Sequence, residues 1–326
     1  MIGFSEGFHD AAVAVVNDGR ICYATHSERY SKIKHDKHLD ITAASTAQLL
    51  CHDGKIAFYE RPWLKRTRQL FAGQKAWYRP RHLTLEPTEY HSHHKSHAAA
   101  AFQTSPFEEA ACVVVDSIGE WDTTSIWTAK YKDGKAIYKK VWSQWYPQSI
   151  GLWYSALTKW AGLRPLDEEY IFMGMAAFGD PVHMNVVERQ LHKNNHKGAR
   201  LGNYKKEDIA KSAERILQLE LNNIFAKAAK YSNNICYGGG VALNCVVNTG
   251  LREMYNMWIM PCPGDAGGAL GAACLAYGRK VAFSPYLGYN IQKFCDPRRV
   301  VDALLEKRVV GVANGRSEFG PRALGN

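Results

Sequence analysis

The sequence lacks several features that would assign it to a known class. Its eight cysteines form no Cys-x-x-Cys pair, which excludes a zinc ribbon and a thioredoxin-type redox site. There is no apolar run of about 18 residues, the length that a membrane-spanning helix needs. The N-terminus, 1–6, has neither the basic segment nor the apolar stretch of a signal peptide. Most cysteines lie within apolar runs, which is typical of buried thiols in a reducing compartment. We therefore expect a cytoplasmic protein without a membrane anchor.

The composition is that of a globular protein with a basic excess. Of 326 residues, 46% are apolar and 22% are charged, which excludes a disordered chain, a collagen-like fibre and a small disulfide scaffold. The length fits about two domains, or one duplicated α/β domain. Lys and Arg number 41 against 31 Asp and Glu, a net charge of +10. Such a surplus suits an anionic partner, whether a nucleotide, a phosphate ester or a nucleic acid.

One pattern of short strands occurs twice. An apolar run at 2–5, a loop, a run at 11–16, the turn signal Asp18-Gly19 and a run at 20–25 predict three strands. The same order returns with 111–115, a loop after Asp116, 123–131, the turn Asp133-Gly134 and 136–142. We interpret this as a duplication; an accidental likeness of hairpins is the alternative.

The second half adds helices and glycine-rich turns. The spacing of apolar residues predicts helices over 149–162 and 207–230. Short strands at 235–237 and 258–260 run into Gly238-Gly239-Gly240 and Pro263-Gly264-Asp265, and 267–277 is a small-residue helix. A glycine turn between a strand and a helix directs free N–H groups toward an anion. Together with the repeat, this predicts a duplicated nucleotide-binding α/β fold of two lobes, similar to the actin/Hsp70-like (ASKHA, RNase H-like) architecture.

Histidines and two aspartates form a candidate metal site. His93 and His97 stand four residues apart before Ala98–Ala101, so a helix would present both on one face. Asp116 and Asp265 each follow a strand, where α/β proteins bind ligands. The alternatives are a basic helix start for the histidines, a turn aspartate for Asp116 and a helix N-cap for Asp265.

Other segments have more than one interpretation. Gly238–Gly240 is not a P-loop, because no Gly-Lys-Ser/Thr follows; it is either a nucleotide-binding turn or a plain tight turn. The basic run Lys65–Arg68, near Trp63 and Trp77, suits a polyanion but is more often a solvated face.

Taken together, the motifs resemble one family, the O-carbamoyltransferases of nodulation-factor, cephamycin and aminoglycoside biosynthesis (the NodU/CmcH type). The resemblance runs the length of the chain and rests on the collinear order of the following segments: Gly7–Ala12, Ser27–Asp36, His93–Ala99, Asp116–Trp121, Met173–Gly179, Gly239–Asn244, Pro263–Gly267 and Gly315–Asn326.

The resemblance implies an activity and a set of site residues. A YrdC-like domain of the family makes carbamoyl-adenylate from carbamoyl phosphate and ATP, and the actin-like domain transfers the carbamoyl group to an acceptor hydroxyl. It implies a divalent metal, typically iron(II), on His93, His97, Asp116 and Asp265. His9 and Lys34 match transfer-site positions. Nucleotide contacts are expected at Gly238, Gly239, Gly240, Asn244 and Gly267, and Arg316 and Arg322 suit carbamoyl phosphate.

The chemistry agrees with these roles. Carbamoyl transfer places negative charge on the carbonyl oxygen, which Lys34 or a metal would stabilise. The acceptor hydroxyl needs a base, for which neutral His9 is suited.

The resemblance also implies the domain organisation. We expect the actin-like domain at 1–285, with lobes of about 1–110 and 111–285, and the beginning of a truncated YrdC-like domain at 286–326. There, 280–297 is rich in turns, 298–306 predicts a helix and 309–313 predicts a strand. Because the family motif continues beyond Asn326, either the gene is split or truncated, or a separate polypeptide supplies the rest.

Two alternatives stay open. One is a tRNA threonylcarbamoyl-type transferase of the same fold, which the positive charge would suit. The other is a non-catalytic remnant that still binds nucleotide. The acceptor is a hydroxyl-bearing small molecule (a sugar or a nucleoside) in the favoured interpretation, and the sequence does not choose it.

Overall fold

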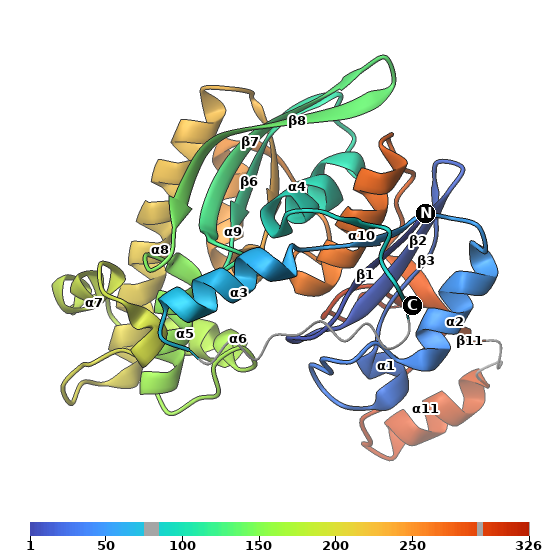
Figure 1. Ribbon diagram of the computed structural model, residues 1–326. Coiled ribbons are helices and arrows are strands. Elements are labelled where there is room, and N and C mark those ends of the chain that lie inside the picture. Colours follow the sequence, from blue (N-terminus) through green and yellow to red (C-terminus); the bar gives the residue numbers. More distant parts are fainter. Residues whose placement is uncertain (75–84, 292–295, 326) are drawn as a thin grey trace.

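Two mixed sheets with the same strand order form the centre of the molecule (Figure 1). The computed structural model describes residues 1–74, 85–291 and 296–325; Trp77 and Asn326, named above, lie outside them. The first sheet has the order β3-β2-β1-β4-β5. The second, read from its β8 edge, has the matching order β8-β7-β6-β9-β10. The strands are β1 Ile2–Ser5, β2 Ala12–Asn17, β3 Arg20–His26, β4 Ile56–Phe58 and β5 Glu89–Tyr90, then β6 Glu109–Val115, β7 Asp122–Lys132, β8 Lys135–Trp145, β9 Asn234–Gly238 and β10 Asn256–Ile259.

The duplication extends to strand direction. In each sheet three strands form an antiparallel meander, and the fourth and fifth run parallel to the first. Both predicted tight turns are present, because Asp18-Gly19 and Asp133-Gly134 all adopt positive φ, as a two-residue hairpin turn requires. The predicted fold class, a duplicated two-lobed α/β fold of the actin-like kind, is therefore confirmed.

Two helices cross between the halves. α4 (His93–Gln103) follows the first sheet but packs on β6, β7 and β9 of the second. α10 (Asp265–Tyr277) follows the second sheet but packs on β1, β2 and β4 of the first, and against α4. The contact between the two helices is close, since a Cβ added at Gly271 would lie 1.9 Å from the Ser96 carbonyl oxygen. This exchange brings both helix N-termini to the middle of the molecule.

Two of the remaining helices cover faces of the sheets. α2 packs on β2 and β3, and α8 packs on β6 and β9. A core that includes Trp153, Phe172 and Phe225 lies between the second sheet and the helices α5, α6 and α8. The bounds are α1 Glu28–Ser31, α2 Ile41–Leu50, α3 Pro62–Phe71, α5 Ile150–Trp160, α6 Glu169–Met175, α7 Met184–Leu191, α8 Lys206–Ala229, α9 Cys245–Met254 and α11 Pro297–Leu305, with short 3₁₀ helices η1 Ala176–Phe178, η2 Asn195–Lys197 and η3 Gly240–Leu243.

The C-terminal part differs from the sequence prediction. β11 (Tyr286–Ile291) lies in the stretch interpreted as turns, and it pairs with β12 (Gly315–Glu318). The strand predicted at 309–313 is absent, and Val309 is fully exposed without a pairing partner. Apolar residues alone do not make a strand; they need a neighbouring edge, which β11 and β12 supply to each other. The domain boundaries stay predictions.

The basic run in α3 also differs from its favoured interpretation as a solvated face. Lys65 and Arg68 are buried, whereas Trp63, Leu70 and Phe71 on the same helix are exposed. Among the described residues, no helix is long and apolar enough to cross a membrane.

Candidate metal centre

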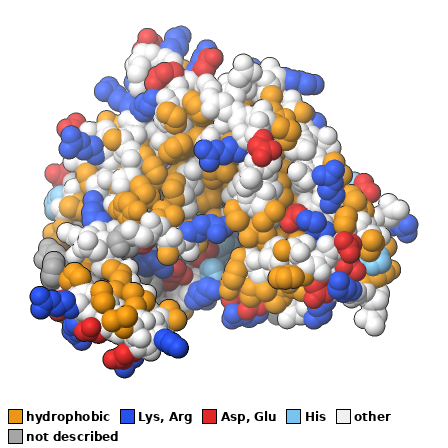
Figure 2. Space-filling view, turned by 180° about the vertical axis from the view of Figure 1, so that it is seen from behind, with side chains coloured by type: hydrophobic (Ala, Val, Ile, Leu, Met, Phe, Trp, Pro, Cys, Tyr) orange, Lys and Arg blue, Asp and Glu red, His pale blue; other side chains and the backbone are white. Residues whose placement is uncertain are grey.

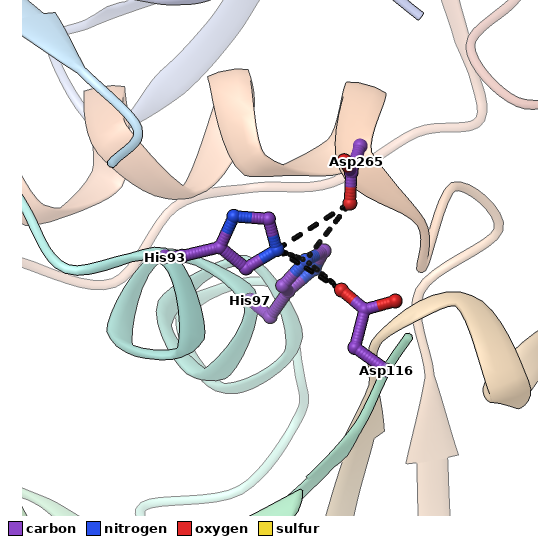
Figure 3. Close-up of side chains that lie close together, drawn as sticks. All are labelled: His93, His97, Asp116 and Asp265. Carbon is purple, nitrogen blue, oxygen red and sulfur yellow. Dashed lines mark hydrogen bonds and ion pairs between the residues drawn. The ribbon is translucent and has the colours of Figure 1, made fainter. Parts of the chain in front are cut away.

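Four side chains that could bind a metal meet where the two crossing helices begin (Figure 3). His93 and His97 extend from the first turns of α4 and Asp265 from the first residue of α10, while Asp116 follows β6. All four are buried. The i, i+4 spacing thus places both imidazoles on one face, as predicted. Asp265 is not the N-cap of its helix, because Gly264 occupies that position.

The distances between the candidate ligand atoms fit a metal ion. The Nε2 atoms of His93 and His97 lie 3.1 Å apart, and they lie 3.0 and 3.3 Å from Asp116 Oδ2. Asp265 Oδ1 is 3.4 Å from His93 Nε2 and 3.5 Å from His97 Nε2. Ligands about 2.1 Å from a tetrahedral or octahedral ion are separated by about 3.0–3.4 Å along its edges. Two imidazoles and two carboxylates suit iron, manganese or zinc.

Electrostatics favour a cation at this point. Burial acts to lower the pKa of His93, but the carboxylates of Asp265 and Asp116 outweigh it and hold that pKa well above its ordinary value. Burial would likewise raise the pKa of Asp265, yet His93 and His9 hold it well below its ordinary value. The carboxylates therefore stay ionised, and their charge is balanced either by protons on the imidazoles or by a metal ion.

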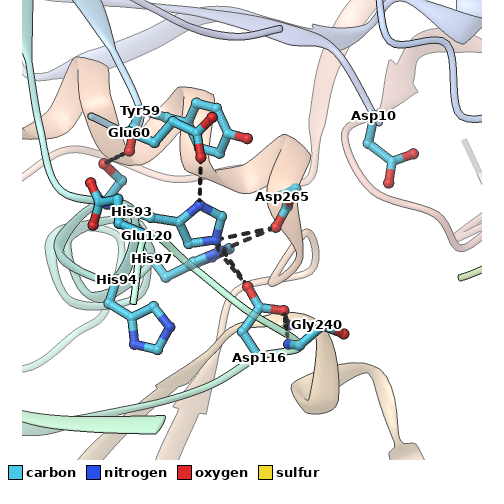
Figure 4. Close-up of polar contacts among 12 residues, drawn as sticks. Asp10, Tyr59, Glu60, His93, His94, His97, Asp116, Glu120, Gly240 and Asp265 are labelled. Carbon is cyan, nitrogen blue, oxygen red and sulfur yellow. Dashed lines mark hydrogen bonds and ion pairs between the residues drawn. The ribbon is translucent and has the colours of Figure 1, made fainter. Parts of the chain in front are cut away.

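Asp116 has two functions, one for each oxygen. Oδ2 faces the histidines, while Oδ1 accepts hydrogen bonds from the N–H groups of Ser117 at 2.8 Å and Gly240 at 3.2 Å. The loop-capping interpretation of Asp116 and the metal interpretation are thus compatible. Gly239 adopts φ +90°, and a Cβ there would lie 2.3 Å from the Val115 carbonyl oxygen. The glycine turn can therefore lie directly against the end of β6, beside the cluster (Figure 4).

A second layer of buried charge supports His93. Its Nδ1 atom lies 3.4 Å from Glu60 Oε2 (Figure 4). Glu60 also accepts hydrogen bonds of 2.9 and 3.1 Å from Lys65. Glu120 accepts a hydrogen bond of 3.1 Å from the His93 N–H. A carboxylate on the far nitrogen of a metal-binding histidine fixes its tautomer and orientation.

A line of alternating histidine and aspartate side chains leads from the cluster to the surface. His9 Nε2 lies 3.5 Å from Asp265 Oδ2, and His9 Nδ1 lies 2.7 Å from Asp10. The other oxygen of Asp10 is 2.7 Å from Nδ1 of His35. His35 Nε2 is 3.2 Å from Asp167, which also forms an ion pair with Lys34. Asp167 belongs to the loop between α5 and α6, so this line joins the two halves of the chain.

The structure gives four other predicted residues contacts outside this cluster. The side chain of Asn244 caps α9 by accepting a hydrogen bond from the Val247 N–H. Gly267 allows close packing, because a Cβ there would lie 1.9 Å from the Cys262 carbonyl oxygen. Arg316 donates to the carbonyl oxygens of Cys22, Leu287 and Gly288, and Arg322 donates to that of Leu243. Their nucleotide and carbamoyl phosphate roles stay predictions.

Sequence reasoning missed several residues around the site. Glu60, Lys65, Glu120 and Asp167 were not predicted as members, although Glu60 follows a buried strand, as Asp116 does. His94 lies between the two candidate ligands in sequence but points away from them and contacts Ser125 at 2.7 Å (Figure 4). Helix geometry accounts for His94: with 3.6 residues per turn, the residue after His93 faces another side.

Comparison with known families identifies this class of two-lobed protein. Residues 64–207 and 188–274 match the family described as carbamoyltransferase N-terminus. The chain belongs to this carbamoyltransferase family, so the resemblance inferred from the motifs is confirmed, and with it an enzyme of the carbamoyltransferase kind.

Individual relatives cover nearly the whole chain. It is 30% identical to the uncharacterized protein sll1178 of Synechocystis sp., over 100% of this chain and 70% of that protein. It is 24% identical to nodulation protein NolNO and 26% identical to nodulation protein U, both of Sinorhizobium fredii, over 98% and 97% of this chain. It spans 57% of the length of NolNO and 72% of that of nodulation protein U.

Solved structures show a distant likeness. A HypF structure in the phosphate- and nucleotide-bound form is 13% identical, with a TM-score of 0.48, over 85% of this chain and 55% of that chain. The activator of the 2-hydroxyisocaproyl-CoA dehydratase from Clostridium difficile is 12% identical, with a TM-score of 0.49, over 96% of this chain and 99% of that chain.

Proposed function

We propose that this chain carries the transfer half of an ATP-dependent O-carbamoyltransferase. It would move the carbamoyl group from carbamoyl-adenylate, made from carbamoyl phosphate and ATP, to the hydroxyl of a sugar or nucleoside. One observation supports this most directly: a metal-binding arrangement of His93, His97, Asp116 and Asp265 directly contacts His9. Membership of the carbamoyltransferase family supports carbamoyl transfer as the reaction at these residues.

The metal would be iron(II), as the family implies, held by these four side chains. When bound, it would act as a Lewis acid that stabilises negative charge on the carbonyl oxygen. The residues present fit such an ion, because their ligand atoms all lie within 4.8 Å of one another and are buried.

His9 is the proposed base. Its Nδ1–H donates to Asp10, which leaves Nε2 to accept the proton of the acceptor hydroxyl. The hydroxyl oxygen then bonds to the carbamoyl carbon, the bond from that carbon to the adenylate phosphate oxygen breaks, and AMP leaves. Lys34 has three N–H donors, so its ion pair with Asp167 leaves donors for the carbonyl oxygen.

The nucleotide would bind at Gly238–Gly240, whose backbone lies beside Asp116. Asn244 and Gly267 shape this region in our proposal, through the cap of α9 and the packing at Cys262. Arg322 is exposed and better placed than Arg316 to meet carbamoyl phosphate, because Arg316 donates to three carbonyl oxygens.

The adenylate-forming step would belong to a YrdC-like region, of which 286–326 is the proposed beginning. A separate polypeptide could supply the rest. The tRNA threonylcarbamoyl alternative has one observation in its favour, the net charge of +10. It predicts tRNA binding that weakens steeply with salt, which a filter-binding titration would detect.

The test is a transfer assay with supplied carbamoyl-adenylate. The purified chain should carbamoylate a panel of sugars and nucleosides, and His9→Gln should lower the rate by about 100-fold or more, the usual contribution of a general base. His38→Gln, on an exposed histidine, is the matched control. No transfer by the folded, metal-loaded chain, alone or with a YrdC-like partner, would refute the proposal.

A further inference from the structure

The helix α3 presents its faces in an unusual way. An amphipathic helix normally buries its apolar side chains and exposes its charged ones. α3 exposes Trp63, Leu70 and Phe71 and buries Lys65 and Arg68, whose exposures are 3% and 5%. In Figure 1 this helix lies across the front of the molecule, from the first sheet toward α5.

Contacts along α3 bind it to both halves of the chain. At its beginning, Lys65 pairs with Glu60, and its ammonium group lies 4.5 Å from the Phe8 ring centre. At its end, Phe71 contacts Trp121 with ring centres 5.5 Å apart. The guanidinium of Arg68 lies 5.7 Å from the ring centre of Tyr146, directly after β8. The buried face of α3 therefore runs from the His9 and His93 region to the end of the second sheet.

The two buried cations differ in their partners. Lys65 is neutralised by Glu60. Arg68 has two buried nitrogens, Nε and Nη1, without a hydrogen-bond partner, and in the described part of the chain it forms no ion pair with a carboxylate. A buried guanidinium cannot escape this cost by losing its proton, because its pKa lies far above physiological pH. Buried charges in proteins are normally paired.

The surroundings of Arg68 are an aromatic ring, an imidazole beyond that ring and one carboxylate that has other partners. His196 contacts Tyr146, with ring centres 5.6 Å apart. Partial burial, followed by the charge of Arg68, lowers the pKa of His196. The carboxylate of Glu60 is close enough to act on the charge of Arg68, but its contacts are with Lys65 and His93. Figure 2 shows the opposite face, where charged side chains gather in a hollow between the two halves.

We propose that Arg68 is an anion-binding residue that holds a phosphate or carboxylate group of the acceptor molecule. This inference rests on the proposed function, because it assumes an acceptor whose hydroxyl lies near His9. The planar guanidinium donates two parallel hydrogen bonds, which match two oxygens of either group. Lys65 lies one helical turn from Arg68, about 5 Å along the axis, and it contacts Phe8 beside His9. The acceptor is thus an anionic compound, such as a sugar phosphate or nucleotide, that extends along α3.

The experiment measures inorganic phosphate binding by calorimetry to the full chain, in the presence and absence of saturating AMP. The variants are Arg68→Gln, Arg68→Lys and Arg66→Gln. Arg66 is exposed on the same helix, so its variant loses the same charge without touching the buried face. We expect Arg68→Gln to weaken phosphate binding by about 10- to 100-fold, as loss of a charge-assisted hydrogen bond does. The phosphate affinity of Arg68→Lys should lie between those of the wild type and Arg68→Gln. That of Arg66→Gln should stay within about twofold of the wild-type value.

Thermal unfolding separates ligand binding from a structural role. Phosphate should raise the Tm of the wild type but not of Arg68→Gln, and without phosphate Arg68→Gln should melt no lower than the wild type, since an unpaired buried charge is removed. A lower Tm of Arg68→Gln with no effect of phosphate on the wild type would show that Arg68 only stacks on Tyr146, and would overturn the proposal.

The two sources of phosphate are distinguished by AMP. If phosphate still binds with AMP saturating, the anion belongs to the acceptor; competition by AMP would assign Arg68 to the nucleotide and overturn the acceptor assignment. Metal content and AMP affinity of the wild type are measured in the same samples. If the wild type binds phosphate but holds no metal and does not bind AMP, the proposed function is refuted and the anion site at Arg68 still stands.

Discussion

Asp10 accepts a hydrogen bond of 2.7 Å from Nδ1 of His9, and this contact directs the other nitrogen of His9 toward Asp265, 3.5 Å away. The same carboxylate also binds His35 at 2.7 Å. One side chain therefore sets the orientation of two histidines, one beside the candidate metal centre and one beside the loop of the second half.

Asp10→Asn should change the titration of His35. The pKa of His35 is raised to about 9, with the hydrogen bond to Asp10 as its largest cause. Replacing the carboxylate by an amide should lower that pKa by at least about one unit, because a neighbouring charge is lost. A raised histidine pKa stabilises the fold fully below the ordinary histidine pKa of 6.5, and this stabilisation is lost as the pH rises through about 9. The variant should therefore be less stable than the wild type below about pH 9, and the difference should disappear above it. Histidine NMR titration of the metal-free protein measures the shift; an unchanged His35 pKa would show that Asp10 does not act on it.

Lys65→Met should destabilise the fold by about 3–5 kcal/mol, because it removes the ammonium group that pairs with the buried carboxylate of Glu60. The double variant Lys65→Met/Glu60→Gln should recover much of that loss. Urea unfolding of the four proteins gives the coupling free energy. Additive effects of the two changes would mean that the pair contributes no specific interaction.

Gly271→Ala should cost at least about 2 kcal/mol, since its Cβ would lie 1.9 Å from a backbone oxygen of α4. Gly174, within α6, has open space around it and provides the control. Gly174→Ala should stabilise by about 0.5–1 kcal/mol through helix propensity. Equal effects of the two substitutions would contradict the close approach of α4 and α10.

Glu6→Gln should make stability less dependent on pH. Burial raises the pKa of Glu6 to about 7 from 4.5, so the folded state retains a proton that the unfolded chain releases. Stability should therefore fall as pH rises from about 4.5 to 7, and the glutamine variant should avoid this loss. The variant should be more stable than the wild type by about 2–3 kcal/mol at pH 8 and similar at pH 4.5. Urea unfolding at both pH values tests this; an equal difference at both would exclude titration of Glu6 as the cause.

The parts of the fold that could be predicted depend on local rules. The pairs Asp18-Gly19 and Asp133-Gly134 adopt positive φ, and such Asp-Gly pairs predict a hairpin turn from the local sequence alone. The i, i+4 spacing of His93 and His97 likewise fixes their common face. Their meeting with Asp116 and Asp265 depends in addition on the crossing of α4 and α10, which the sequence indicated only through the family resemblance.

The parts that could not be predicted depend on long-range packing. Nothing local in α3 shows that Lys65 and Arg68 are buried, because their burial follows from Glu60, Phe8 and Tyr146. The donors of Arg316 bind the carbonyl oxygens of β3 and β11, a pairing set by strands distant in sequence. The apolar run 309–313 forms no strand and pairs with no strand in the described structure.

The metal content of the chain tests the central claim most directly. The protein would be purified without oxygen, and bound metal would be measured by mass spectrometry in the wild type, His93→Ala/His97→Ala and His38→Ala/His52→Ala. His38 and His52 are exposed and lie outside the cluster. We predict about one metal ion per chain in the wild type and in the exposed-histidine control, and loss of that ion in the first double variant. A folded wild type without metal, or a first double variant that retains it, would contradict the account.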